Sequence, residues 1–128
     1  MGNPVTYFEI AAKNGKELCD FYSSVFGWKI EQLPGGDQGI YSYGVDSQSE
    51  DGIAGHIFVL PEFFDFSNQV TFYIKVDNLQ TYLQKVESLG GHTFIPPQQI
   101  PGNRGSFAWF FDPSGNCLGL YRHPESNE

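Results

Sequence analysis

The chain has 128 residues, of which 40% are hydrophobic and 16% aromatic, and its formal net charge is −8. This length and composition predict one domain with a real core and exclude a disordered chain. The acidic charge, without a basic cluster, argues against a nucleic-acid or anionic-membrane partner, and no apolar run approaches the roughly 20 residues of a membrane span.

The first half of the chain predicts a strand, a helix and three further strands. Val5–Ile10 alternates in the manner of a strand. Asn14 is expected to cap a helix that runs to about Phe26 and stops at Gly27, because apolar residues recur there at helical spacing. Three more strands are expected at about 28–33, 40–45 and 53–60.

A connector at 61–68 with three phenylalanines precedes a second half that repeats this order. The second half predicts a strand at 70–76, a helix capped by Asp77 or Asn78, a strand at 92–95 cut short by Pro96-Pro97, and two hairpin strands. The hairpin turn is expected at 112–116, since proline presets φ for the first central position and Gly115 accepts a positive φ.

The two halves align with one another. Tyr7 and Thr71 lie 64 residues apart, and the pairs Asp51-Gly52 and Ser114-Gly115 lie 63 apart. This register predicts two tandem βαβββ modules, at about 4–60 and 69–123, within a single domain 1–128. The predicted fold is α+β: a curved eight-stranded mixed sheet with helices outside and a concave face inside.

Several motifs, in order and over nearly the whole chain, resemble those of the vicinal oxygen chelate superfamily, which includes glyoxalase I, bleomycin-resistance proteins and extradiol dioxygenases. They are Tyr7-Phe-Glu-Ile10, Phe21-Tyr22, Val25-Phe-Gly-Trp28, Val76-Asp-Asn-Leu79, Leu89-Gly-Gly91, and Asp112-Pro-Ser-Gly-Asn116 followed by Leu118-Gly-Leu120. The chain looks most like small single-chain glyoxalase-like proteins related to lactoylglutathione lyase.

The resemblance implies four metal-ligand positions on the concave face, which map to Tyr7, His56, Thr71 and Gly119. A divalent ion needs about three His or carboxylate donors, and of these four residues only His56 is a good one. We therefore expect neither a metal nor another cofactor; Glu9 is the one further donor expected on that face.

Strand alternation predicts which side chains share the concave face. They are Tyr7, Glu9, His56, Phe58, Thr71, Tyr73, Cys117 and Tyr121, with Tyr41 or Tyr43 and Phe107 or Trp109 contributing according to twist. This surface suits a small, partly apolar ligand held by stacking and a few hydrogen bonds. Arg104, in a loop before a cleft strand, could clamp a carboxylate or phosphate.

Three functions remain open at this point. The first is metal-independent binding of a small molecule. The second is a lyase, isomerase or dioxygenase-type enzyme, with His56 as general base and Glu9 as its orienter. The third is a dimeric interaction protein whose cleft is filled. Whichever function holds, the connector at 61–68 is expected to be a homodimer contact or a lid over the cleft. The resemblance implies a homodimer, and the lack of a secretory signal or a cysteine framework predicts a cytoplasmic protein.

Overall fold

The computed structural model describes residues 2–34, 41–59 and 69–124. The chain divides into two compact units, which we call the first unit (residues 7–70) and the second unit (residues 1–6 and 71–128). The predicted connector at 61–68 lies outside the described residues.

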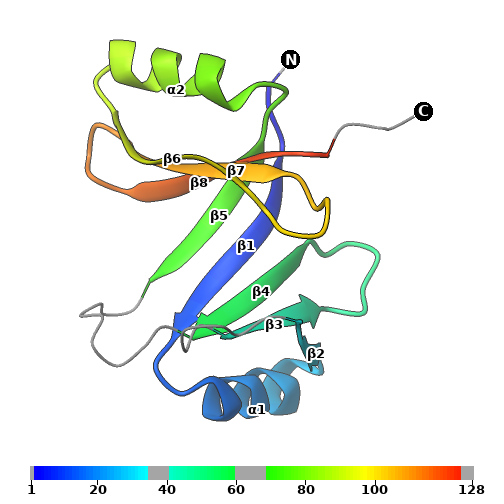
Figure 1. Ribbon diagram of the computed structural model, residues 1–128. Helices are drawn as coiled ribbons and strands as arrows, with labels where there is room; N and C mark the ends of the chain where they lie inside the picture. Colours follow the sequence, from blue (N-terminus) through cyan, green and yellow to red (C-terminus); the bar gives the residue numbers. More distant parts are fainter. Residues whose placement is uncertain (1, 35–40, 60–68, 125–128) are drawn as a thin grey trace. The chain divides into compact units, whose positions relative to one another are not determined.

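The first unit carries helix α1 (Gly15–Phe26) and a mixed set of strands. The strands are β1 (Val5–Ala12), β2 (Lys29–Gln32), β3 (Tyr41–Asp46) and β4 (Ala54–Val59), in the order β2-β3-β4-β1. The pairs β2–β3 and β3–β4 are antiparallel, whereas β1 and β4 run parallel. Helix α1 contacts β2, β3 and β4 (Figure 1).

The second unit repeats this arrangement with helix α2 (Leu79–Ser88). Its strands are β5 (Val70–Lys75), β6 (His92–Gln99), β7 (Ser106–Phe111) and β8 (Cys117–Arg122), in the order β5-β8-β7-β6. The pair β5–β8, at one end of this order, is parallel, as β1–β4 is in the first unit, and α2 contacts β6, β7 and β8 (Figure 1). The α+β class, the eight strands and the two βαβββ modules predicted from the sequence are confirmed.

The helix ends follow the predicted capping residues. The Asn14 side chain accepts a hydrogen bond from the Glu17 N–H, and Gly27 ends α1 with φ of 71°. Of the two candidate caps for α2, Asn78 is the one used, because its side chain accepts from the Thr81 N–H. These bonds satisfy backbone donors that the first helical turn leaves without an internal partner.

Strand β6 differs from its prediction. It does not stop before Pro96-Pro97 but continues to Gln99, with register shifts on either side of Ile95. Proline is tolerated here because β6 is the last strand in the order and needs backbone donors on one side only.

The turn between β7 and β8 forms as predicted around Asp112. Its carboxylate accepts hydrogen bonds from the backbone N–H groups of Ser114 and Asn116 and from the Asn116 side chain. These bonds hold the pKa of Asp112 below its ordinary value, with the Asn116 side chain as the largest cause. Gly115 takes φ of 89°, which its lack of a side chain permits.

Each unit has its own apolar core beneath its helix. The first core contains Ala12, Val45 and Ile57, with Phe8 and Ile10 among the residues packed against it. The second core contains Val76, Leu79, Leu83, Ala108, Phe110 and Leu120. Phe72 is 41% exposed and belongs to neither core.

Two further findings concern the cysteines and membrane association. Cys19 and Cys117 are thiols and are half-buried. Within residues 2–34, 41–59 and 69–124, neither helix has the length and apolarity that a membrane crossing needs.

Candidate functional site

Three polar side chains of the first unit form a hydrogen-bonded chain. His56 Nε2 lies 2.8 Å from Glu9 Oε1, and His56 Nδ1 lies 2.9 Å from the Tyr7 hydroxyl oxygen. The parallel pairing of β1 and β4 sets Glu9 opposite His56, and Tyr7 precedes Glu9 by two residues and so points to the same face. The predicted pair His56 and Glu9 is thus in direct contact.

The protonation pattern of this chain follows from its partners. An ionised carboxylate only accepts hydrogen bonds, so Nε2 carries the proton that is donated to Glu9. In the neutral imidazole, Nδ1 then accepts from the Tyr7 hydroxyl. Glu9 is only 5% exposed, and a carboxylate this deeply buried requires such a donor. Both ring nitrogens of His56 are therefore engaged.

Aromatic rings surround the imidazole on the same face. The Tyr7 ring lies 5.3 Å and the Phe58 ring 6.1 Å from that of His56, centroid to centroid, and Phe58 is buried. Four residues predicted for the ligand-binding face, Tyr7, Glu9, His56 and Phe58, are thus brought together within the first unit.

Two other predicted contributors lie elsewhere. Tyr43 packs against the core beneath α1, together with Val45 on the same face of β3. Tyr41 shares that alternation and is exposed. The expectation that Tyr41 or Tyr43 joins the ligand-binding face is therefore wrong; the reason is that β3 turns this set of side chains toward α1.

The second unit holds an aromatic pair at the corresponding place. Trp109 Nε1 donates a 2.8 Å hydrogen bond to the Tyr73 hydroxyl, and Tyr73 is 6% exposed. Gly119 lies opposite Tyr73 in the β5–β8 register, and the ring packs directly on the glycine. Phe107 and Trp109 point away from the buried row of Ala108 and Phe110 and so share one face of β7.

The remaining predicted ligand-binding residues also lie in the second unit. Thr71 is buried, and the hydroxyl of half-buried Tyr121 donates to the Arg104 backbone carbonyl at 2.7 Å. Burial raises the pKa of Tyr121. Arg104 Nε donates to the Pro101 carbonyl at 2.8 Å, so the guanidinium braces its own loop.

The two βαβββ modules, each with one parallel strand pair, define a class of proteins built from two copies of one module. The family model for the Glyoxalase/Bleomycin resistance protein/Dioxygenase superfamily matches residues 5–120, and the chain belongs to this superfamily.

The chain is also similar to individual proteins and solved structures. The chain is 23% identical to a glyoxylase-like domain-containing protein of Didymella fabae, over 94% of each chain. It is 24% identical to the anthracycline biosynthesis protein DnrV of Streptomyces peucetius, over 91% of this chain and 46% of that one. It thus spans less than half the length of this bacterial relative. Among solved structures, methylmalonyl-CoA epimerase from Mycobacterium tuberculosis superposes with a TM-score of 0.72 at 13% identity, over 94% of this chain and 88% of that one.

The metal positions implied by the family do not fit an ion in this chain. Tyr7 and Glu9 occupy opposite nitrogens of the His56 ring, so an ion bound to either nitrogen would reach only one of the two oxygens. Gly119 supplies no side-chain donor, and the Tyr73 ring occupies the space beside it. Among the described residues, no three His, Cys, Asp or Glu side chains are grouped as metal ligands.

Sequence reasoning missed two features. It named Tyr7 as a ligand-binding residue but not as the second partner of His56; the alternation of β1 and the β1–β4 register together carry that signal. It also missed a polar row at Gln99, Ser106 and Arg122, which depends on the register of three strands.

Proposed function

We propose that the protein binds a small, partly apolar molecule without a metal ion, on the face formed by Tyr7, Glu9, His56 and Phe58. The observation that carries this proposal is the hydrogen-bonded chain Glu9–His56–Tyr7. It engages both nitrogens of the one good metal donor among the mapped positions, and it presents a phenol and an imidazole beside an aromatic side chain.

The ligand class follows from the chemistry of these groups. Aromatic faces stack on planar apolar groups, while the phenol supplies a directed hydrogen bond. The relative DnrV is named for anthracycline biosynthesis, which is consistent with small-molecule chemistry on this fold. We further propose that the protein acts as a homodimer in the cytoplasm.

A thermal-shift screen of planar aromatic compounds tests the proposal. A ligand present at about 100 times its dissociation constant should add roughly 2.7 kcal/mol to the free energy of unfolding. Each hit is then titrated by calorimetry against Tyr7→Phe and His56→Gln, with Glu31→Gln on exposed β2 as the control. We expect the first two variants to weaken binding and the control to leave it unchanged. Hits unaffected by both site variants would show that this face is not the site.

Metal analysis of the purified protein tests whether the proposed binding is independent of a metal ion. The purified protein should contain no stoichiometric zinc, nickel or iron, and added ions should not bind saturably. Stoichiometric metal together with turnover of methylglyoxal and glutathione would overturn metal-independent binding.

The same hydrogen-bonded chain favours a second candidate, an acid–base enzyme acting on a carbonyl compound. If the Tyr7 hydroxyl proton passes to His56 Nδ1, the imidazolium that forms is held by Glu9, and the phenolate can take a proton from a carbon next to a carbonyl. Deuterium incorporation from solvent into such substrates, followed by NMR, tests this. Exchange that is lost in Tyr7→Phe would support it, and its absence across a panel of α-keto compounds and thioesters would count against it.

A further inference from the structure

The hydrogen-bonded chain Glu9–His56–Tyr7 has a direction, because each of its protons belongs to one bond. The ionised Glu9 carboxylate accepts from His56 Nε2, and His56 Nδ1 accepts from the Tyr7 hydroxyl. The single proton of that hydroxyl therefore points into the chain. Any further hydrogen bond that the Tyr7 oxygen makes, it makes as an acceptor.

Each bond of this chain strengthens the next one. The Glu9 carboxylate attracts the Nε2 proton of His56, which raises the electron density at Nδ1, and Nδ1 in turn attracts the phenol proton of Tyr7. The Tyr7 oxygen is thus a better acceptor than the oxygen of a tyrosine without such a partner.

Burial places the carboxylate innermost in this chain. The Glu9 side chain is 7% exposed and the His56 side chain 19%, whereas Tyr7 is half-buried. The neighbouring Phe58 is buried and has no polar atom in its side chain. A ligand on this face therefore meets an apolar ring and the acceptor oxygen of Tyr7.

The charge near this face opposes an anionic ligand. The Glu9 carboxylate lies directly behind the imidazole, 2.8 Å from Nε2, and the protein as a whole has a net charge of −8. Both repel negative charge on a ligand, and solvent screens the repulsion only weakly where the groups are partly buried. A neutral donor group avoids this cost.

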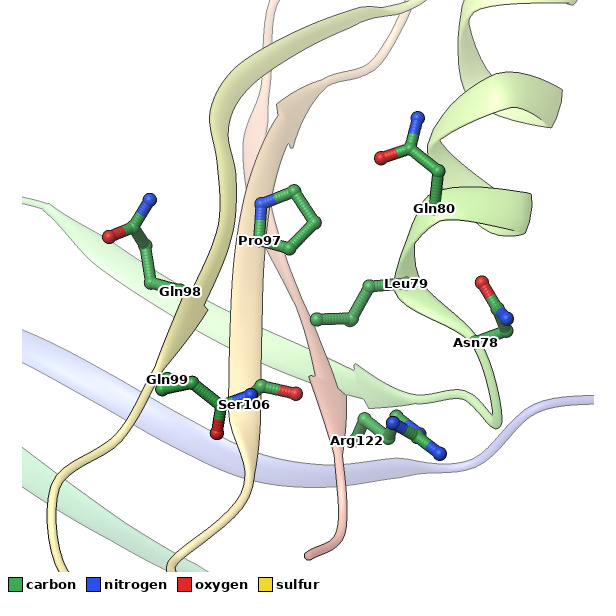
Figure 2. A pocket seen from close by; sticks show the side chains of 8 residues that line it. All are labelled: Asn78, Leu79, Gln80, Pro97, Gln98, Gln99, Ser106 and Arg122. Carbon is green, nitrogen blue, oxygen red and sulfur yellow. The ribbon is translucent and has the colours of Figure 1, made fainter.

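A pocket in the second unit lacks this polarity. Figure 2 shows the glutamine side chains Gln80, Gln98 and Gln99 among those that line this pocket of about 220 Å³. A side-chain amide offers both donors and an acceptor. Such a lining does not distinguish donor groups from acceptor groups, whereas a hydroxyl whose proton is already engaged does.

We propose that the ligand of the Tyr7 and His56 face is an aromatic molecule with a neutral N–H or O–H group, which donates a hydrogen bond to the Tyr7 oxygen. The class comprises N–H heteroarenes and hydroxyarenes, and it excludes aromatic carboxylates and arenes that carry only acceptor atoms. Tyr7 determines this specificity, and Glu9 acts through His56 as a positioning residue. The ligand class rests on the binding function proposed above for the same face.

Three bicyclic probes of nearly the same shape test this ligand class on the full chain. Indole carries an N–H donor, benzofuran has an ether oxygen in its place, and benzoxazole adds to benzofuran a ring nitrogen that accepts. Amide NMR titrations followed on β4 give the three dissociation constants. Indole should bind about fivefold more tightly than benzofuran, as expected for one neutral hydrogen bond, and benzoxazole should bind no more tightly than benzofuran.

A conservative variant assigns the preference to Tyr7. In Tyr7→Phe, indole and benzofuran should bind equally, because the aromatic ring remains and the acceptor oxygen is lost. Tyr41→Phe, at an exposed tyrosine of β3, is the matched control and should keep the preference for indole.

The position of the His56 proton can be measured without a ligand. In protein with ¹⁵N-labelled histidine, a long-range ¹H–¹⁵N spectrum at neutral pH should show a neutral His56 ring with its proton on Nε2, and His56→Gln identifies its signals among those of the three histidines. In Glu9→Gln this tautomer should lose its dominance and the preference for indole should fall, because an amide both donates and accepts. Glu31→Gln, on exposed β2, is the matched control.

The outcomes distinguish this ligand class from the proposed binding function. Equal affinities for the three probes, or tighter binding of benzoxazole than of indole, would overturn the donor preference and leave the binding face intact. A proton on Nδ1 of His56 in the ligand-free protein would also overturn it. The absence of saturable shifts with all three probes would count against the binding face itself, and against the ligand class with it.

Discussion

The two modules place different chemistry at the same pair of strand positions. In the first unit, Glu9 on β1 stands opposite His56 on the parallel strand β4, and the His56 ring donates a hydrogen bond to the Glu9 carboxylate. In the second unit, Tyr73 on β5 stands opposite Gly119 on β8, and the ring packs on the glycine. Glu9 and Tyr73 lie 64 residues apart, and His56 and Gly119 lie 63 apart.

This difference shows that the two modules share a backbone arrangement but not the side chains at the corresponding positions. The first unit keeps titratable groups within hydrogen-bonding distance of one another. The second unit fills the corresponding place with an aromatic side chain whose hydroxyl is held by Trp109. The same strand positions therefore hold a hydrogen-bonded polar pair in one module and an aromatic ring packed on glycine in the other.

The largest loss of stability is expected from a substitution that adds a side chain at Gly119. In Gly119→Ala, the new Cβ would stand 2.3 Å from the Tyr73 ring, which is buried and cannot move cheaply. Overpacking of this kind should lower the free energy of unfolding by about 3 kcal/mol, measured by urea denaturation. In a Tyr73→Ala background the same substitution should cost less than about 1 kcal/mol.

Gly2→Ala is the control for that substitution, since no heavy atom lies within 4 Å of its added Cβ. Equal stability of the Gly119→Ala and Gly2→Ala proteins would contradict the aromatic-on-glycine packing.

The next largest loss of stability is expected when the hydrogen bonds of His56 with Glu9 and Tyr7 are removed. His56→Ala removes the imidazole donor from buried Glu9 and should cost about 1 to 3 kcal/mol of unfolding free energy. Tyr7→Phe removes a single hydrogen bond and should cost about 1 kcal/mol. His92→Ala, at an exposed histidine of β6, serves as the control. Loss of His56 with no more effect than loss of His92 would argue against a structural role for the hydrogen bond between His56 and Glu9.

The two helix caps should contribute equally to the stability of the protein. Asn14 and Asn78 each accept one backbone N–H at 3.0 Å, so each substitution by alanine should cost about 1 kcal/mol. Gln84→Ala, at an exposed position within α2, should cost almost nothing. Helix content followed by circular dichroism during thermal unfolding measures all three. Unequal losses would mean that tertiary contacts outweigh capping in one of the modules.

The smallest change is expected in the pH dependence of stability, from the Asp112 carboxylate in the β7–β8 turn. Hydrogen bonds from Asn116 and Ser114 keep the pKa of Asp112 below its ordinary value of 3.8. A carboxyl whose pKa is lowered by folding stabilises the protein above its unfolded-state pKa, and that contribution is lost as the pH falls through the lowered value. Asp112→Asn should therefore flatten the acid limb of a stability–pH curve. An unchanged slope below pH 4 would contradict this assignment.

Sequence patterns were sufficient for the fold because they are local. Apolar periodicity, Asn14 and Asn78 as caps, and the Asp112–Asn116 turn each act over a few residues, and their repetition reveals the two modules. Strand alternation also placed Glu9 and His56 on one face. The contacts of the site could not be predicted in the same way. That Tyr7 rather than solvent meets His56 Nδ1, and that Gln99, Ser106 and Arg122 form one row, depend on pairings between residues distant in sequence.

The two prolines of β6 have a consequence for self-association. Strand β6 is the last in the sheet order, and an edge strand offers unpaired backbone groups to any other extended chain. Pro96 and Pro97 lack the N–H that such a chain would need to continue its ladder, and the register shifts beside them interrupt its regular spacing. This edge is therefore protected against uncontrolled growth into aggregates.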